Sequence, residues 1–185
     1  NVNFSSAWQS SGLTSFPALD LSNGTNFSSA WHSCTSLTSF SNINMSRGTV
    51  FSYTWYNTGL TSFPAISFEK ATSFFACWLT NNNLVDFASG CFDNWNPDYI
   101  SNNCFAFAFK ASGLSSQSVE NILTSIAASG QYATSTGASG GTALADAGID
   151  IDYNVATGSL SAATNSAVTS LKARGWSIIV NNVTL

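Results

Sequence analysis

Four tryptophans recur at nearly constant spacing, at positions 8, 31, 55 and 78, with gaps of 23, 24 and 23 residues. A phenylalanine stands four residues before each of them, and a leucine followed three residues later by another phenylalanine comes after each. A period of this length, kept in register by large apolar residues, is typical of a solenoid, whose units are too small to bury their own apolar faces. Stacked units share one core and expose an extended surface suited to binding. The repeat therefore favours a binding function over an enzymatic one.

One unit is clearest over residues 13–31, where the apolar template reads L-x-x-F-x-x-I-x-[LMF] and then F-x-x-x-W. Residues two apart on a strand share a face, so Leu19 and Leu21 predict a short extended segment. Residues four apart share a helical face, so Phe27 and Trp31 predict a helical turn packed behind that segment. Phe4 and Trp8 are already in phase, and we expect further repeats or a stem upstream of Asn1.

The fourth unit is expanded near residues 85–109, and its extra stretch is rich in aromatic, amide and carboxylate side chains. Aromatic rings stack on the apolar faces of sugars, and amide and carboxylate groups bind the hydroxyls. Insertions in repeat arrays also tend to form loops on one face. A ligand site is therefore a candidate at Phe92, Asp93, Trp95, Asn96 and Tyr99. The alternative is that these aromatics plug the end of the solenoid.

A second candidate surface follows the repeated leucine, where two hydroxyl residues recur in three units. The six residues are Thr14, Ser15, Thr38, Ser39, Thr61 and Ser62. We expect them to form a flat, uncharged strip that binds a glycan or packs against another chain. The pattern decays at Val85 and Asp86 in the fourth unit.

The sequence pattern changes after Leu114. Apolar residues there have a helical period, at positions 119, 122, 123, 126 and 127. Ser116 or Ser118 is expected to cap this helix and Gly130 to end it. A strand over 148–153, a helix over about 162–173 and a strand over 176–180 follow from their own patterns. We predict a repeat solenoid of about four and a half units over 1–113. We predict that residues 114–185 form a helix-strand-helix-strand cap that is continuous with the solenoid.

Charged residues make up only 8% of the chain, against ~25% in typical soluble domains. The five basic residues are scattered, which argues against nucleic acid as a partner. No apolar run is long enough to predict insertion into a membrane. Cys34 and Cys77 are interpreted as free core thiols. Cys91 and Cys104 either form a disulfide that closes the irregular stretch or stay free.

The sequence offers little for catalysis or metal binding, so we expect no enzyme activity, no cofactor and no metal site. His32 is the only histidine and follows a core tryptophan, and no motif for a nucleophile elbow, a phosphate loop or a zinc protease occurs. Asp150, Asp152 and Asn154 imitate the start of a calcium loop, but the glycine and distal glutamate that should follow are missing. Alternating aspartates on a polar strand face explain them better.

The motif L-T-S-F-P-x-[LI]-x-[LF]-S-x-x-T-x-F-x-x-x-W resembles the short leucine-rich repeats of BspA-type bacterial surface proteins. It resembles still more closely the versions in tail-fibre and other structural proteins of bacteriophages, especially cyanophages. The segments 114–126, 148–154 and 171–178 are similar to the endings of many such phage proteins. The resemblance implies an α/β, leucine-rich-repeat-like solenoid of 23–24-residue units. It carries over no catalytic residues.

A domain of this family is expected on a virion surface, or on another extracellular or cell surface. The leading hypothesis is a phage tail-fibre domain that binds a host surface glycan or protein without catalysis. A second hypothesis is a decoration or spacer domain that contacts only other virion or fibre subunits, as a homo-oligomer. A third is a bacterial cell-surface adhesin. An enzyme that degrades surface polysaccharide is the least favoured hypothesis, because the sequence has few side chains that could act as general acid and base.

Overall fold

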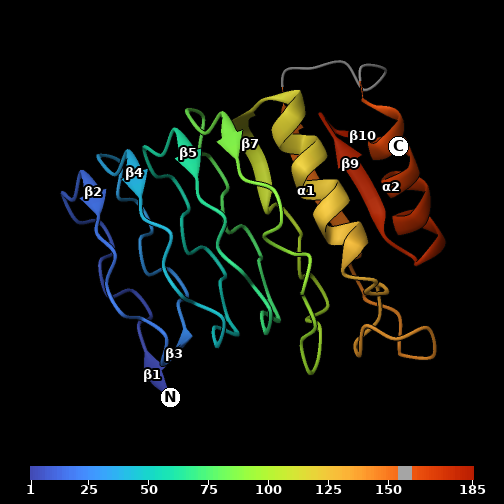
Figure 1. The fold of residues 1–185 in the computed structure, drawn as a ribbon, viewed down its shortest axis with the longest axis horizontal. Coiled ribbons are helices and arrows are strands. Elements are labelled where there is room, and N and C mark those ends of the chain that lie inside the picture. The colour runs from blue at the N-terminus through green and yellow to red at the C-terminus, as the bar shows by residue number, and fades with distance from the viewer. Residues whose placement is uncertain (154–159) are drawn as a thin grey trace.

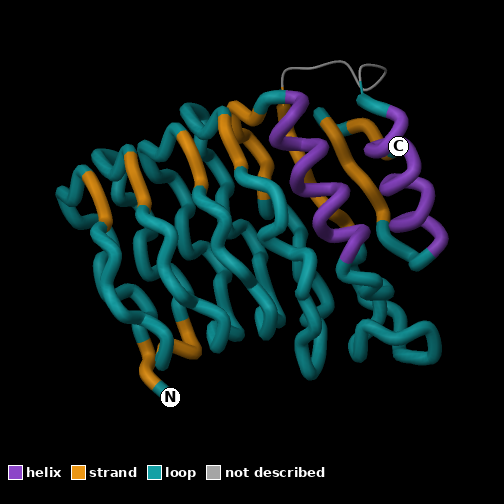
Figure 2. Tube along the Cα trace, in the orientation of Figure 1, coloured by secondary structure: helices purple, strands orange, loops and turns teal. Residues whose placement is uncertain are grey.

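The computed structural model describes residues 1–153 and 160–185, and within them it is a mixed α/β structure with two helices and four small sheets. The repeated units lie side by side as successive turns of one coil, with the N-terminus at one end and both helices at the other (Figure 1). Most of each turn is irregular backbone rather than helix or strand (Figure 2).

Two columns of stacked aromatic rings run through the coil, as the repeat predicts. Ring centroids of neighbours in the phenylalanine column lie 5.1–5.9 Å apart and those in the tryptophan column 4.9–5.6 Å apart. The columns are Phe4, Phe27, Phe51, Phe74, Phe105 and Trp8, Trp31, Trp55, Trp78, Phe109. Units two to four bury their members completely, whereas Phe4 and Trp8 are half-buried because only one neighbouring unit covers them. The units therefore share one core, as the repeat predicts.

Short parallel strands join the units along two edges of the coil. One edge carries β2 (Ser15–Phe16), β4 (Ser39–Phe40), β5 (Ser62–Phe63) and β6 (Asp86–Phe87), and the other carries β1 (Val2–Asn3) and β3 (Gly24–Asn26). The predicted extended segment at Leu19 and Leu21 is wrong, because the strand forms at Ser15–Phe16 instead and Leu19 is 45% exposed while Leu21 is buried. The bend after Pro17 breaks the alternation on which that prediction depended.

The F-x-x-x-W segment is not a helical turn, which corrects a second prediction. In the second unit Ser29 and Ser33 take left-handed backbone angles, with φ of 56° and 59°, and the equivalent residues of the other units do the same. The amide groups of Phe27 and Trp31 donate to carbonyls of the next unit at 2.9 Å instead of to their own turn. Hydrogen bonds between units therefore replace those of a helix. The spacing of apolar residues does not indicate which carbonyl a backbone amide will bond to.

The C-terminal cap is a four-stranded sheet with both helices on one face (Figure 1). Its elements are β7 (Phe109–Leu114), α1 (Ser116–Ala128), β8 (Gly148–Tyr153), α2 (Ala162–Ala173), β9 (Ser177–Val180) and β10 (Val183–Thr184). Strands β7, β8 and β9 are parallel neighbours, and each crossover contains one helix, which places both helices on the same side. The helix-strand-helix-strand order predicted from the sequence is confirmed.

Three details of the cap differ from the prediction or lie outside it. Ser115, not Ser116 or Ser118, is the N-cap of α1, and its side chain accepts from the amide of Ser118. Strand β7 spans the predicted boundary at 113/114 and continues the tryptophan column through Phe109, so cap and repeats share one core. Asn154, the third residue of the calcium-loop imitation, lies outside the described residues.

Two glycines that begin the same sequence, G-L-T-S-F-P-A, provide a matched test of the coil. A Cβ on Gly59 would lie 2.4 Å from the carbonyl oxygen of Thr35 in the preceding unit, whereas a Cβ on Gly12 would meet nothing within 4 Å. We expect Gly59→Ala to lower the free energy of unfolding by about 1–3 kcal/mol, because the backbones of two units must move apart. Gly12→Ala should be neutral or stabilising. Urea denaturation of both variants would check this, and equal losses would contradict the close approach.

Candidate functional site

The expanded fourth unit does not present its aromatics to a ligand. Phe92 and Trp95 are 0% and 1% exposed, and the Trp95 ring lies 6.0 Å from that of Trp176 in the cap. Trp95 Nε1 donates to the carbonyl oxygen of Ala71 at 2.7 Å. The prediction of ligand contact by Phe92 and Trp95 is therefore wrong: the cap covers them, and they plug the end of the coil.

The remaining members of that candidate site are divided between two surface hollows. Asp93 and Asn96 line a shallow pocket beside Gln131, and Ser125 of α1 donates to the Asp93 carboxylate at 2.6 Å. These residues tie the loop to the cap. Tyr99 lies elsewhere and is 56% exposed, so it is the one aromatic of the predicted site that is free to contact a ligand.

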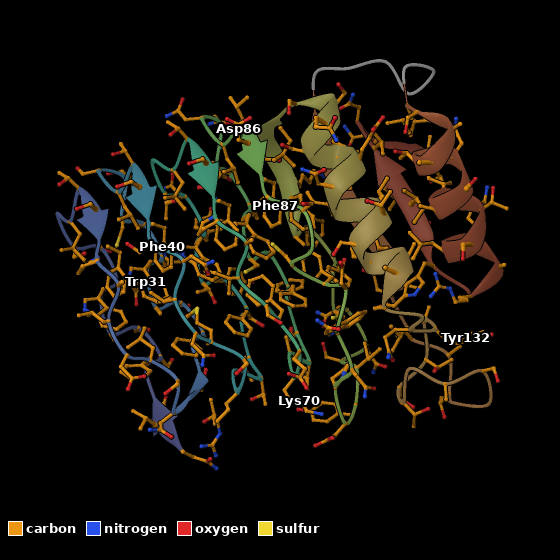
Figure 3. The ribbon with its side chains drawn as sticks, in the orientation of Figure 1. Trp31, Phe40, Lys70, Asp86, Phe87 and Tyr132 are labelled. Atoms are coloured by element: carbon orange, nitrogen blue, oxygen red, sulfur yellow. The ribbon has the colours of Figure 1, made fainter. Side chains whose placement is uncertain are left out.

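Tyr99 lines a cavity of about 450 Å³, which we call the threonine groove. A column of threonines from three units forms its floor: Thr25, Thr49 and Thr72. Asn1, Arg47, Lys70 and Asp98 line it together with Tyr99. Lys70 lies at the lower edge of the coil in Figure 3, opposite the edge that carries Asp86. The groove therefore joins the coil to the expanded fourth unit.

A second surface consists of three aromatic side chains that run along the coil, which we call the aromatic row: Tyr53, Phe75 and Phe107. The Tyr53 and Phe75 ring centroids lie 5.3 Å apart and those of Phe75 and Phe107 5.8 Å apart. Tyr53 and Phe107 are 36% and 41% exposed. At its cap end, Lys110 Nζ lies 5.5 Å from the centre of the Phe107 ring. A contiguous row of partly exposed rings is unusual on a chain whose surface is otherwise rich in hydroxyl groups.

The aromatic row occupies strained backbone. Tyr53 and Phe107 have φ of 58° and 57°, in the left-handed region that bulky residues rarely adopt. The equivalent positions of the first two units carry Ser6 and Ser29 in the same conformation. The Phe107 amide donates to the Asp150 carboxylate at 2.9 Å, which helps to hold its turn. The burial of a partly exposed ring offsets little of the energy that this backbone conformation costs. Residues in strained conformations cluster at ligand sites.

The hydroxyl strip lies on the opposite edge of the coil from the threonine groove (Figure 3). All six of its residues are exposed, and Ser15 pairs with Ser39 in register across two units. Its proposed role in binding stays a prediction.

All four cysteines are free and buried, so Cys91 and Cys104 form no disulfide, and burial raises the pKa of both thiols to about 12. Their thiolates are therefore scarce at neutral pH. Within the described residues, no group of three or more histidine, cysteine, aspartate or glutamate side chains could hold a metal ion. No helix in that part of the chain has the length and apolarity to cross a membrane.

Comparison with known proteins places the chain in no family: no protein-family model, no curated protein and no solved structure matches it.

The threonine groove and the aromatic row cannot be predicted from single residues. Their residues do, however, recur at equivalent positions of the aligned units. Arg47 and Lys70 each stand four residues before the phenylalanine of their unit, at 51 and 74, so neighbouring turns bring them together. Tyr53 and Phe107 each stand two residues after that phenylalanine. Aligning the polar positions of the units, and not only the apolar ones, would have indicated both.

Proposed function

We propose that this chain is a non-enzymatic recognition domain, a leucine-rich-repeat-like solenoid that binds a surface glycan. The observation that carries the proposal is the aromatic row of Tyr53, Phe75 and Phe107, in which Tyr53 and Phe107 occupy strained, left-handed backbone. Its setting would be a virion surface, as in a phage tail fibre, or another extracellular surface. The family resemblance of the repeat supports that setting.

The chemistry of the row suits a sugar chain better than a protein partner. Aromatic rings contact the apolar faces of sugar rings, and the hydroxyl of the neighbouring, partly exposed Ser29 can hydrogen-bond a sugar hydroxyl. The row is narrow, whereas a stable protein interface buries roughly 800 Å² on each partner. It also runs across several units, so it matches an elongated ligand lying parallel to the axis of the coil.

Replacing the exposed rings by the residue that equivalent units carry should abolish this binding without unfolding the chain. We expect the double variant Tyr53→Ser/Phe107→Ser to lose about 1–3 kcal/mol of binding free energy per ring, on the scale of aromatic stacking on bases. Its melting temperature should stay unchanged or rise. The measurement is affinity electrophoresis through gels containing cellulose ethers, galactomannan, xylan or laminarin, of which at least one should retard the wild-type chain.

Leu19→Ser is the matched control, because it removes an exposed apolar side chain elsewhere on the coil. It should migrate like the wild type in every gel. The proposal fails if no polysaccharide retards the wild type, or if the double variant is retarded equally. A self-association that Tyr53→Ser/Phe107→Ser abolishes in sedimentation velocity would instead favour the structural spacer.

A further inference from the structure

We infer that the threonine groove is a separate binding site for an anionic sugar, one that carries a carboxylate or a sulfate. Its lining shares no residue with the aromatic row, so it goes beyond the glycan binding proposed above. Three features of this cavity support the inference: its charges, the hydrogen-bonding state of its hydroxyls and its exposed ring.

The groove is a local positive site on a chain of net charge −4. Arg47 and Lys70 are two of the five basic residues in the sequence. Each makes one hydrogen bond to a neutral oxygen: Arg47 to the side chain of Asn23 and Lys70 to the carbonyl of Asn96, both at 3.1 Å. Neither has an ion-pair partner among residues 1–153 and 160–185. Both therefore keep their charge and several N–H donors for an incoming anion.

The threonine hydroxyls complement these donors with acceptors. Thr49 Oγ1 donates to the carbonyl of Thr25 at 3.0 Å, and Thr72 Oγ1 donates to that of Thr49 at 2.9 Å. Because each hydroxyl proton is already used, the oxygen lone pairs are what remain for a ligand. Thr49 is only partly buried and can offer them. The cavity thus has cationic donors for an acid group and neutral acceptors for hydroxyl groups.

Tyr99 and Asp98 complete the match to a sugar rather than to a simple ion. The Tyr99 ring is 56% exposed and gives an apolar surface for a sugar ring. The Asp98 carboxylate can accept hydrogen bonds from sugar hydroxyls but repels an acid group. Arg47 and Lys70 attract that acid group, so the two effects oppose each other in this cavity. A cavity of about 450 Å³ is within the usual range for small-ligand sites. Nucleic acid is a poor fit, because two cations neutralise too few phosphates.

Calorimetric titration with three hexasaccharides tests the inference: hexagalacturonate for the carboxylate, a heparin hexasaccharide for the sulfate and maltohexaose as the neutral probe. At least one acidic probe should bind the wild-type chain, and raising the salt concentration should weaken it. Arg47→Gln and Lys70→Met should each weaken this binding by about tenfold, the scale of one charge-assisted contact. Asp98→Asn should strengthen it. Binding of hexagalacturonate identifies the carboxylate as sufficient, and binding of the heparin probe alone identifies the sulfate, because heparin carries carboxylates as well as sulfates.

Lys172→Met is the matched control, because it removes the same charge from an exposed lysine of α2. It should leave binding unchanged. The inference is overturned if neither acidic probe binds, if Lys172→Met weakens binding as much as Lys70→Met, or if Asp98→Asn weakens it. Binding of a neutral polysaccharide should survive Arg47→Gln/Lys70→Met and be lost in Tyr53→Ser/Phe107→Ser, so that failure of this site and failure of the aromatic row are distinguishable.

Discussion

Replacing Trp55 by alanine should lower the free energy of unfolding by about 3–5 kcal/mol, the range for large aromatic residues in cores. The ring is fully buried and lies between Trp31 and Trp78, with both centroid distances 5.6 Å. Phe40 and Phe63 contact it edge-on. Alanine leaves a cavity in the middle of the column, and the stacked units on either side cannot close it without breaking their hydrogen bonds to each other. Urea denaturation followed by circular dichroism measures the loss.

Two controls show whether the column or the residue type is responsible. Trp55→Phe should cost less than half as much, since Phe109 fills the same column and the Trp55 indole N–H has no partner among the described residues. Trp8→Ala should also cost less, because Trp8 has a neighbour on one side only and is half-buried. Equal losses at positions 8 and 55 would contradict a stabilising column.

Replacing Asn81 by leucine should lower the free energy of unfolding by about 3 kcal/mol, although the two side chains are similar in size. Asn81 is fully buried, and its Oδ1 accepts from the backbone amide of Thr58 at 2.7 Å and from the Thr58 hydroxyl at 2.8 Å. Its Nδ2 donates to the carbonyl of Trp55 at 2.7 Å. Leucine would leave these three buried polar groups of the preceding unit without partners, which water cannot reach.

Asn82→Leu is the control, since that neighbouring side chain is exposed. It should change the unfolding free energy by less than about 0.5 kcal/mol. Thermal melting and urea denaturation of both variants give the comparison. A loss at Asn81 no larger than at Asn82 would show that the bridge between units contributes nothing to stability.

The repeat of large apolar residues was enough to predict the core. Residues such as Phe51, Trp55 and Phe63 are so large that a chain of this size can bury them only by stacking one unit on the next. The cap was also readable, since the stripe from Val119 to Ile126 has a helical period whatever lies beside it. Boundaries of α2 agree with the pattern for the same reason.

Backbone conformation between the apolar positions could not be predicted from spacing. A residue such as Ser29 takes a left-handed angle because its unit bonds to the next one, and that partner is some 23 residues away in the sequence. Trp95 was misassigned for a related reason: its cover includes Trp176, which belongs to the cap. Exposure of an aromatic residue is a property of the whole packing and not of its neighbours in sequence.

The sequence by itself therefore determined the shared aromatic core and the order of elements in the cap, because both follow from periodicity, which is a local property of the chain. The tertiary structure alone decided which aromatics reach solvent and which cations share a cavity. Tyr53 and Phe107 are 54 positions apart and belong to one surface, and Arg47 shares a groove with Tyr99. Such contacts follow from the pitch of the coil and the place where the cap covers it, and both are set by packing between distant segments.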